Sequence, residues 1–300
     1  MRDRVIFATR KSRLALAQTR ALVAKLAARN PGLIFEELQI TTSGDKIQDR
    51  ALADIGGKGL FVKEIEEALL AGKADFAVHS LKDVPPELAP SLEVSAIPKR
   101  ADPRDVIVQR SGRGIAELAE GARIGTSSLR RRIQLLALRP DFRIEPLRGN
   151  VDTRIRKCRE GEMDAIVLAR AGLLRLGLAG EATEVLEAET LLPAVGQGAL
   201  AVEQRADDDF IRELLAPLSD PETRIAVAAE RGVMRAVEGN CQTPVAAYGV
   251  RQEGDLWLRG LLAEPDGSAL RRAELRRPWP EAEAEAEAMG IELAQNLRAF

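Results

Sequence analysis

Short apolar runs alternate with amphipathic stretches along the first third of the chain. Residues 5–8 (VIFA) predict a buried strand, and Ser12 can cap the helix that follows, because Leu14, Leu22 and Leu26 recur at helical spacing. Further elements, strand then helix then strand, are predicted at 35–41, 61–70 and 76–79. Strands that alternate with helices of this length indicate βαβ units and a parallel sheet covered on both faces.

The pattern then breaks, and two more blocks follow. Residues 97–105 (IPKRADPRD) hold two prolines and five charges, which is typical of a linker or hinge. The second block has strands near 106, 124, 142 and 165 and helices after Ser127, Asn150 and Arg170. The third block follows the Gly-rich segment GQGAL (196–200). It begins at Asp220, a good helix cap before a proline, and predicts a helix to about 237, three strands from 245 to 275 and a final helix.

Composition and charge exclude several classes of protein. The 44 basic and 46 acidic residues nearly cancel, and aromatic residues are only 3%, so a general nucleic-acid binder is disfavoured. A single histidine removes His-cluster metal sites, and two distant cysteines predict neither a disulfide framework nor a zinc site. With a charged N-terminus and no apolar run near ~18 residues, we expect a soluble, cytoplasmic protein.

Basic residues are nevertheless concentrated between 130 and 159, a stretch that contains ten basic and three acidic residues. The segment GTSSLRR (125–131) leads this block, placing three hydroxyl residues at a strand-to-helix turn and two arginines in the first helical turn. Unpaired backbone N–H groups, hydroxyls and guanidinium groups together predict an anion site. An ordinary serine-capped helix with solvated arginines would give the same pattern.

Two other turns repeat this chemistry. Arg148 precedes Gly149-Asn150 and is followed by Arg154, and Arg10 stands two residues before Ser12 after the first strand. Ligands of α/β proteins usually bind at the carboxyl ends of parallel strands. Together the three turns predict a cleft for a ligand that bears several carboxylates or phosphates.

Three further segments are candidates for chemistry. IGGKGLF (55–61) lacks the spacing of a phosphate-binding loop and is better interpreted as a mobile glycine loop. HSLKDVPP (79–86) sets a lysine beside an aspartate after a strand, either as active-site groups or as a solvated pair, while its histidine favours a structural role. EGNCQTP (238–244) presents Cys241 in a tight turn, whereas Cys158 within a predicted helix favours an inert, half-buried thiol.

Taken together, these segments resemble the porphobilinogen deaminase family, also called hydroxymethylbilane synthases, of tetrapyrrole biosynthesis. The matching segments run in order along nearly the whole chain: ATRKS, GGKGLF, AVHSLKDVP, DPRD, GTSSLRR, LRGN, LPAVGQGA and EGNCQTP. The last sixty or so residues match more loosely.

The resemblance implies an α/β fold of two lobes like those of periplasmic binding proteins, joined by a hinge, and a small α+β C-terminal domain. The expected boundaries are 1–98 plus 199–217 for the first lobe, 104–194 for the second and 220–300 for the C-terminal domain. The active cleft is expected between the lobes, with the cysteine loop presented by the third domain.

The resemblance also implies a transferase reaction. Four porphobilinogen molecules condense head to tail, with release of ammonia, into hydroxymethylbilane, which passes to uroporphyrinogen-III synthase. The family's cofactor is a dipyrromethane, made from the substrate and held by a thioether to the cysteine that matches Cys241. Asp83 matches the catalytic aspartate, and Lys58 and Phe61 would lie on a flexible loop over the cleft.

A ligand with an acetate and a propionate on every ring accounts for the basic residues. The residues expected to contact these carboxylates are Arg10, Ser12, Lys82, Thr126, Ser127, Ser128, Arg130, Arg131, Arg148, Arg154 and Gln197. No metal ligand is assigned.

Two other functions compete with this one. A two-lobed binding protein could capture a polycarboxylate without catalysis, and a nucleic-acid binder could use the block at 130–159. Neither needs Cys241, which therefore discriminates between them and an enzyme. No heptad or apolar stripe predicts an interface, so a monomer is expected.

Overall fold

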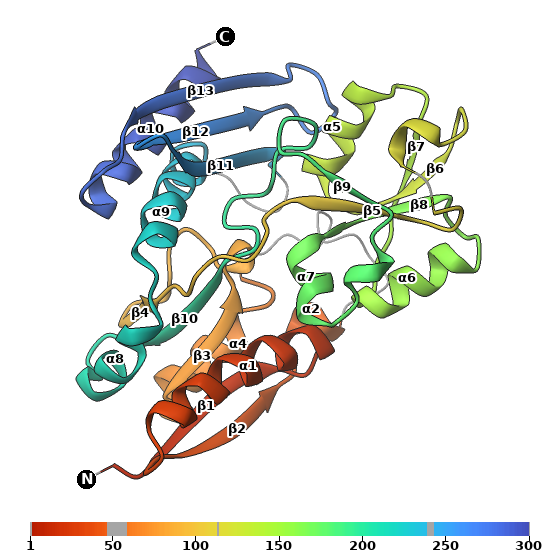
Figure 1. Ribbon diagram of the computed structural model, residues 1–300. Coiled ribbons are helices and arrows are strands. Elements are labelled where there is room, and N and C mark those ends of the chain that lie inside the picture. Colours follow the sequence, from red (N-terminus) through yellow and green to blue (C-terminus); the bar gives the residue numbers. More distant parts are fainter. Residues whose placement is uncertain (1, 47–58, 113, 239–242, 300) are drawn as a thin grey trace. The chain divides into compact units, whose positions relative to one another are not determined.

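The structure is a computed structural model that describes residues 2–46, 59–112, 114–238 and 243–299 (Figure 1). The chain divides into two compact units. Unit 1 takes in Met1–Asp49, Gly57–Arg100 and Ala199–Thr223, and unit 2 contains Ala101–Gly198 and Arg224–Phe300. The predicted boundaries of three domains stay a prediction, and each unit is described by itself.

Unit 1 is built on a five-stranded sheet in the order β2-β1-β3-β10-β4. Its strands are β1 (Arg4–Arg10), β2 (Ile34–Ile40), β3 (Phe76–Ser80), β4 (Leu92–Ala96) and β10 (Leu200–Arg205). Helices α1 (Arg13–Arg29) and α8 (Asp209–Leu215) pack on one face, and α4 (Lys63–Leu70) packs on the other, so both faces bury apolar side chains. The short helix α2 (Ser43–Lys46) follows β2.

The sheet of unit 1 is mixed rather than parallel, which corrects the sequence-based prediction. Strands β2 and β3 run parallel to β1, whereas β10 lies antiparallel between β3 and β4. The chain enters β10 directly after the GQG segment, more than a hundred residues beyond its neighbour β3. Pairing between such distant segments leaves no local pattern in the sequence, so neither β4 nor β10 was predicted as a strand.

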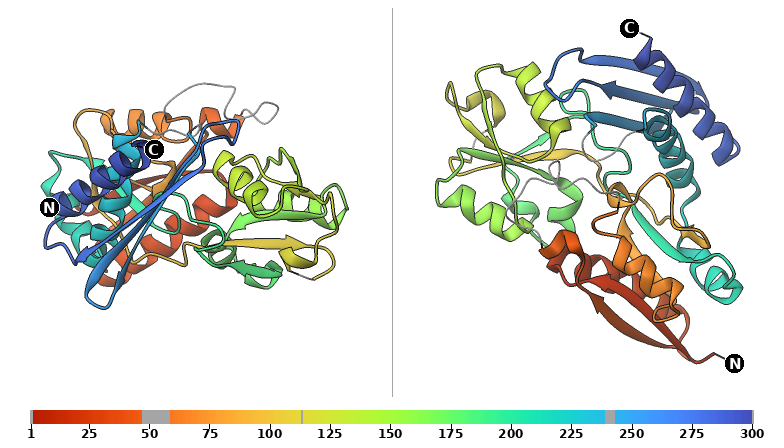
Figure 2. Two further views of the ribbon diagram at one scale, coloured as in Figure 1. Left: turned by 90° about the horizontal axis from the view of Figure 1, so that it is seen from above. Right: turned by 180° about the vertical axis from the view of Figure 1, so that it is seen from behind.

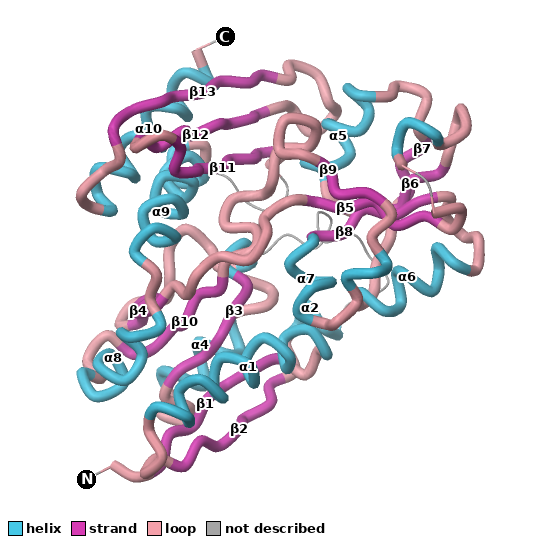
Figure 3. Tube along the Cα trace, viewed as in Figure 1, coloured by secondary structure: helices cyan, strands magenta, loops and turns pink. Residues whose placement is uncertain are grey.

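Unit 2 contains a second mixed sheet, in the order β7-β6-β8-β5-β9 (Figure 3). Its strands are β5 (Asp105–Gln109), β6 (Arg123–Gly125), β7 (Arg143–Glu145), β8 (Ala165–Ala169) and β9 (Glu184–Leu186). Helix α5 (Leu129–Leu138) packs against one face, while α6 (Val151–Arg159) and α7 (Arg170–Arg175) pack against the other. The predicted second α/β block is confirmed.

The C-terminal part of unit 2 is an antiparallel sheet of β11 (Val245–Gln252), β12 (Asp255–Leu262) and β13 (Arg271–Pro278). Helices α9 (Pro221–Ala236) and α10 (Glu283–Arg298) share one apolar core with this sheet, and the blue end of the chain in Figure 2 shows α10 against the strands. The three predicted strands and two helices are present, which confirms the α+β prediction for this part.

Predicted helix starts agree with the caps that the structure contains. Ser12 Oγ accepts a hydrogen bond from Ala15 N at 3.3 Å, and Asp220 Oδ1 accepts one from Thr223 N at 2.8 Å. Both satisfy N–H groups that the first helical turn leaves without partners.

Candidate functional site

In unit 1, the predicted site residues stand where β1 and β3 end. Arg10 is the last residue of β1, and its Nε and Nη2 donate to the Asp45 carboxylate at 3.3 and 2.5 Å. The guanidinium carbon lies 4.1 Å from the centre of the Phe61 ring, a cation–π contact. The sequence predicts that Ser12 contacts a ligand, but in the structure its side-chain oxygen caps the N-terminus of α1.

Lys82 and Asp83 lie in the 3₁₀ turn Leu81–Asp83, directly after β3. Leu81 N donates to Ala199 O at 3.1 Å, which extends the hydrogen-bond ladder between β3 and β10 by one bond. The start of the turn is therefore held by the sheet. Both side chains are half-buried, and the Asp83 carboxylate makes no hydrogen bond or ion pair with the described residues. The pair therefore stands on a fixed turn with that carboxylate available to a ligand.

His79 is a structural residue, as the sequence favoured. Its Nε2 lies 2.8 Å from Glu203 Oε2 of β10, with both side chains buried. The contact is close but is not an aligned hydrogen bond, since His79 Nε2 is among the buried atoms without a hydrogen-bond partner. Burial and the charge of Glu203 raise the pKa of the neighbouring Glu66 on α4.

In unit 2, the three hydroxyl residues after β6 build the turn itself. Ser128 Oγ caps α5 by accepting from Arg131 N at 3.4 Å, and Thr126 Oγ1 accepts from Ser128 N at 3.2 Å. Ser127 Oγ donates to Leu147 O at 3.0 Å and accepts from Leu147 N at 3.1 Å, which ties this turn to the one after β7. Two of the predicted anion sites are thus neighbours.

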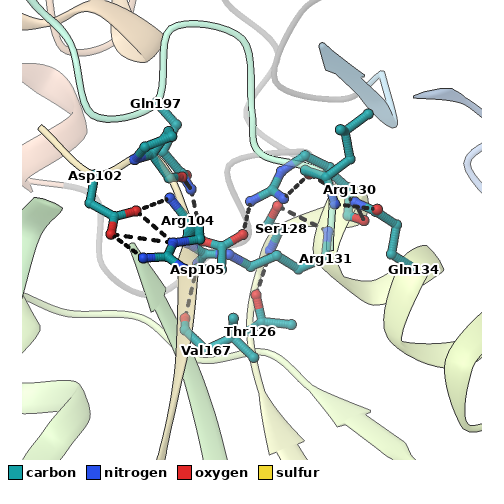
Figure 4. A network of polar contacts seen from close by, with 12 residues as sticks. Asp102, Arg104, Asp105, Thr126, Ser128, Arg130, Arg131, Gln134, Val167 and Gln197 are labelled. Carbon is teal, nitrogen blue, oxygen red and sulfur yellow. Dashed lines mark hydrogen bonds and ion pairs between the residues drawn. The ribbon is translucent and has the colours of Figure 1, made fainter. Parts of the chain in front are cut away.

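Arg130 and Arg131 are buried and share one carboxylate (Figure 4). The Nη2 atoms of both arginines donate to Asp105, each at 2.7 Å, and their Nη1 atoms donate to the carbonyls of Leu192 and Val167. Gln197 Nε2 completes the cluster by donating to Asp105 Oδ1 at 2.9 Å. The sequence placed these three residues on a ligand, whereas the structure first places them on Asp105.

The charge of Asp105 is fixed by this cluster. Burial alone would raise the pKa of this carboxyl, but the charges and hydrogen bonds of Arg130 and Arg131 outweigh it and hold the pKa well below its usual range. The three ionised groups carry one net positive charge. Arg131 Nε is buried and has no hydrogen-bond partner, so one N–H donor of the cluster is unpaired.

Arg154 is a half-buried cation without a nearby acid among the described residues. Its Nε donates to Gly149 O at 2.8 Å, and no carboxylate of the described residues lies within ion-pair distance. Burial lowers the pKa of Arg154 to about 10, helped by the charges of Arg131 and Arg148. The predicted cluster of positive charge is therefore present around the turn after β7.

Sequence reasoning missed Arg175, which has the same electrostatic character. It ends α7 after β8, donates from Nη2 to Gly198 O at 2.7 Å, and burial lowers its pKa to about 10. It also missed Asp105 and Asp45. An acid that opens an apolar strand (DVIV) was the available signal for Asp105, because a charge there needs a partner.

Part of the basic block is neutralised locally, whereas the exposed Arg132 and Arg143 make no ion pair with the described residues. The exposed or half-exposed bases of α6, Arg156, Lys157 and Arg159, pair with Glu160, Glu162 and Glu181. This pairing removes three of the cations that a surface for nucleic acid would use.

Several predictions fall elsewhere. Lys58 and Cys241 lie outside the described residues, as does most of the predicted glycine loop. Cys158 is buried rather than half-buried and donates to Val108 O at 3.4 Å, and burial raises the pKa of its thiol, which is typical of an inert cysteine. Within the described ranges, no group of three His, Cys, Asp or Glu side chains could hold a metal ion, and every helix is too short or too polar to cross a bilayer.

Fold and site together define a mixed α/β protein with a buried arginine pair on one carboxylate and half-buried arginines without an acid partner among the described residues. The family model for the dipyrromethane cofactor-binding domain of porphobilinogen deaminase matches residues 5–213, and the model for that family's C-terminal domain matches 224–299. The chain belongs to the porphobilinogen deaminase family, a family of transferases, and the predicted cofactor is confirmed.

Curated relatives agree along the whole chain. A porphobilinogen deaminase of Sorangium cellulosum is 61% identical over 298 residues, covering 99% of both chains. One of Syntrophotalea carbinolica is 53% identical, covering 97% of this chain and 91% of the relative. Among solved structures, the chain is similar to a probable amino-acid ABC transporter extracellular-binding protein of Bacillus subtilis, with 12% identity and a TM-score of 0.44. The match covers 73% of this chain and 90% of that protein.

Proposed function

We propose that this chain is a hydroxymethylbilane synthase. It joins four porphobilinogen molecules head to tail, releases ammonia at each step, and starts from a dipyrromethane attached to Cys241. Its curated relatives carry the name porphobilinogen deaminase at up to 61% identity over 99% of the chain, which supports this reaction. Neither a simple binding protein nor a nucleic-acid binder accounts for a family with a covalent cofactor.

One observation in the structure carries the proposal. Arg154 and Arg175 are half-buried, the partial loss of water lowers the pKa of each to about 10, and neither has an acid of the described residues beside it. A buried cation without a counter-charge is costly unless a ligand supplies that charge. A carboxylate 4 Å from such a guanidinium would contribute about 4 kcal/mol at an effective dielectric constant near 20, and less where solvent enters.

These sites fit the dipyrromethane, which carries an acetate and a propionate on each ring. In unit 2, Arg148, Arg154 and Arg175 would bind such carboxylates, and the buried Arg131 would add its positive charge beside Arg154. In unit 1, Arg10 and Lys82 would do so. Ser12, Thr126, Ser127, Ser128, Arg130 and Gln197 would hold the turns and guanidinium groups that surround these contacts. When bound, the cofactor supplies the free pyrrole position to which the first substrate is joined.

Asp83 would act on the substrate. Loss of ammonia leaves positive charge on the pyrrole, and a carboxylate held on a rigid turn stabilises that charge where it develops. The same oxygen atoms can accept the pyrrole N–H and take up or return a proton. The site then needs no imidazole, in keeping with the burial of the chain's one histidine.

The test is the Asp83→Ala variant, with Asp207→Ala, an exposed carboxylate of unit 1, as its control. Asp83→Ala should carry the same covalent mass as wild type while hydroxymethylbilane formation falls by at least about a hundredfold, a loss typical of removing one electrostatic stabiliser. Wild-type turnover by Asp83→Ala would refute the assigned role.

Three further features belong to the proposal. Among the described residues, the exposed large apolar side chains lie singly along the sequence, which supports a monomer; they are Ile34, Leu70, Leu138, Leu174 and Phe210. A buried reduced Cys158 and the scarcity of cysteine support the cytoplasm. The linear product would pass to a ring-closing enzyme, uroporphyrinogen-III synthase. A native mass of two chains would contradict the monomer.

A further inference from the structure

Arg10 is held on two sides by its own unit. Asp45 accepts from Nε and Nη2, which are the two donors along one edge of the guanidinium group, and the Phe61 ring covers its face. Nη1 makes no hydrogen bond with the described residues. With 21% of the side chain exposed, the group therefore presents one fixed edge to a ligand.

Asp45 and Phe61 are themselves fixed. Thr42 N and Oγ1 donate to Asp45 Oδ2 at 3.2 and 2.8 Å, so the carboxylate is anchored within its own segment. Gly44 N donates to Leu60 O at 2.9 Å, and a Cβ at Gly44 would overlap the Phe61 ring. The glycine is needed here because the ring packs directly against its Cα.

The charge of this pair differs from that of the other arginine sites. Burial would raise the pKa of Asp45, but the hydrogen bonds and charge of Arg10, with those of Thr42, lower it overall. Asp45 is therefore ionised at neutral pH and cancels the charge of Arg10. Arg154 and Arg175 have no such acid among the described residues.

We propose that Asp45 is a positioning residue that, together with Phe61, orients Arg10 so that its Nη1 edge receives a carboxylate of the pyrrole substrate chain. This inference rests on the proposed function, since the carboxylate is that of porphobilinogen or its oligomer. Arg10 then binds the carboxylate through the fixed orientation of its guanidinium group rather than through a net positive charge. Because the Asp45 carboxylate and the Phe61 ring already hold that group, it loses little rotational freedom when the ligand binds.

The two accounts of Asp45 predict opposite signs. If only net charge mattered, Asp45→Asn would add one positive charge and tighten the binding of an anionic substrate. If Asp45 positions Arg10, the same change weakens binding, because the guanidinium loses its charged acceptor and no longer holds one orientation.

The experiment is a double-mutant cycle on purified, cofactor-loaded enzyme with porphobilinogen as the probe. Asp45→Asn and Arg10→Gln should each raise KM by about tenfold, the size of one lost charged hydrogen bond, with kcat changed much less. The Asp45→Asn/Arg10→Gln double variant should have the KM of Arg10→Gln alone, because the proposal has Asp45 affect substrate binding through Arg10. Asp207→Asn, which removes an exposed charge from the same unit, should match wild type.

A lower or unchanged KM in Asp45→Asn, or additive effects in the double variant, would overturn the inference while leaving the proposed function standing. Phe61→Leu provides a second, independent cycle with Arg10→Gln should Asp45→Asn fail to fold, and it should be equally non-additive. A wild-type protein that carries no covalent pyrroles and does not turn over would overturn both the function and this inference.

Discussion

At the scale of single residues, Asp105 is the group on which two arginines depend. It is fully buried, its two oxygens accept from both guanidinium groups, and Gln197 adds a third hydrogen bond. An isolated buried charge is costly, whereas this one has a hydrogen-bonded counter-ion on each oxygen. Asp105 therefore determines where Arg130 and Arg131 lie before any ligand arrives.

Replacing Asp105 by Asn should destabilise the protein by about 3–5 kcal/mol, because two buried guanidinium groups lose their counter-charge. Urea unfolding at neutral pH measures the change. Because the pKa of Asp105 is lowered on folding, its contribution is complete above the ordinary pKa near ~4 and is lost only as pH falls toward the folded value. The difference between wild type and variant should thus stay constant from about pH 5 to pH 8. A loss below 1 kcal/mol would contradict the assigned role of Asp105.

At the scale of elements, the candidate groups follow the ends of strands within each unit. Arg10 ends β1, Asp83 follows β3, Ser128 follows β6, and Arg148 follows β7. Each turn is closed by its own hydrogen bonds, so the strands supply rigidity and the turns supply chemistry. Helix α6 adds Arg154 from its first turn, toward Gly149.

The Arg154→Gln variant should bind the cofactor or substrate more weakly than wild type and be at least as stable against unfolding. The substitution removes a half-buried cation that has no acid partner among the described residues, so the melting temperature should stay level or rise. Cofactor loading should fall, or KM for porphobilinogen should increase, by at least about tenfold. Arg156→Gln, on the exposed face of the same helix and paired with Glu160, is the matched control and should change neither. Destabilisation of Arg154→Gln with unaltered loading and KM would show that Arg154 is structural.

Local sequence patterns predicted much of the fold, and they failed where partners are distant. Ser12, Ser128 and Asp220 cap helices as their residue types suggest, since a cap depends on three or four neighbouring residues. The insertion of β10 between β3 and β4 depends on a segment that returns from unit 2, which no periodicity records. The same holds for the site, where Arg130 was assigned to a ligand because Asp105, 25 residues earlier, could not be foreseen as its partner.

At the scale of the whole molecule, the net charge is only −2, but the individual charges are distributed unevenly. Exposed bases such as Arg20 and Arg277 pair with acids, whereas Arg154 and Arg175 are half-buried and have no acid partner among the described residues. Long-range attraction is therefore weak, and binding depends on groups inside the protein. Family membership over the full chain assigns a ligand whose carboxylates match those groups.

The intact mass of the purified protein, beside that of its Cys241→Ser variant, tests the central claim most directly. Wild type should exceed the mass of its sequence by two linked pyrrole units, and the variant should lack that excess, because the thioether needs the cysteine sulfur. Incubation with porphobilinogen should then add further pyrrole units to wild type alone. A wild-type mass that equals the bare sequence and stays unchanged with porphobilinogen would contradict the covalent primer and the function proposed from it.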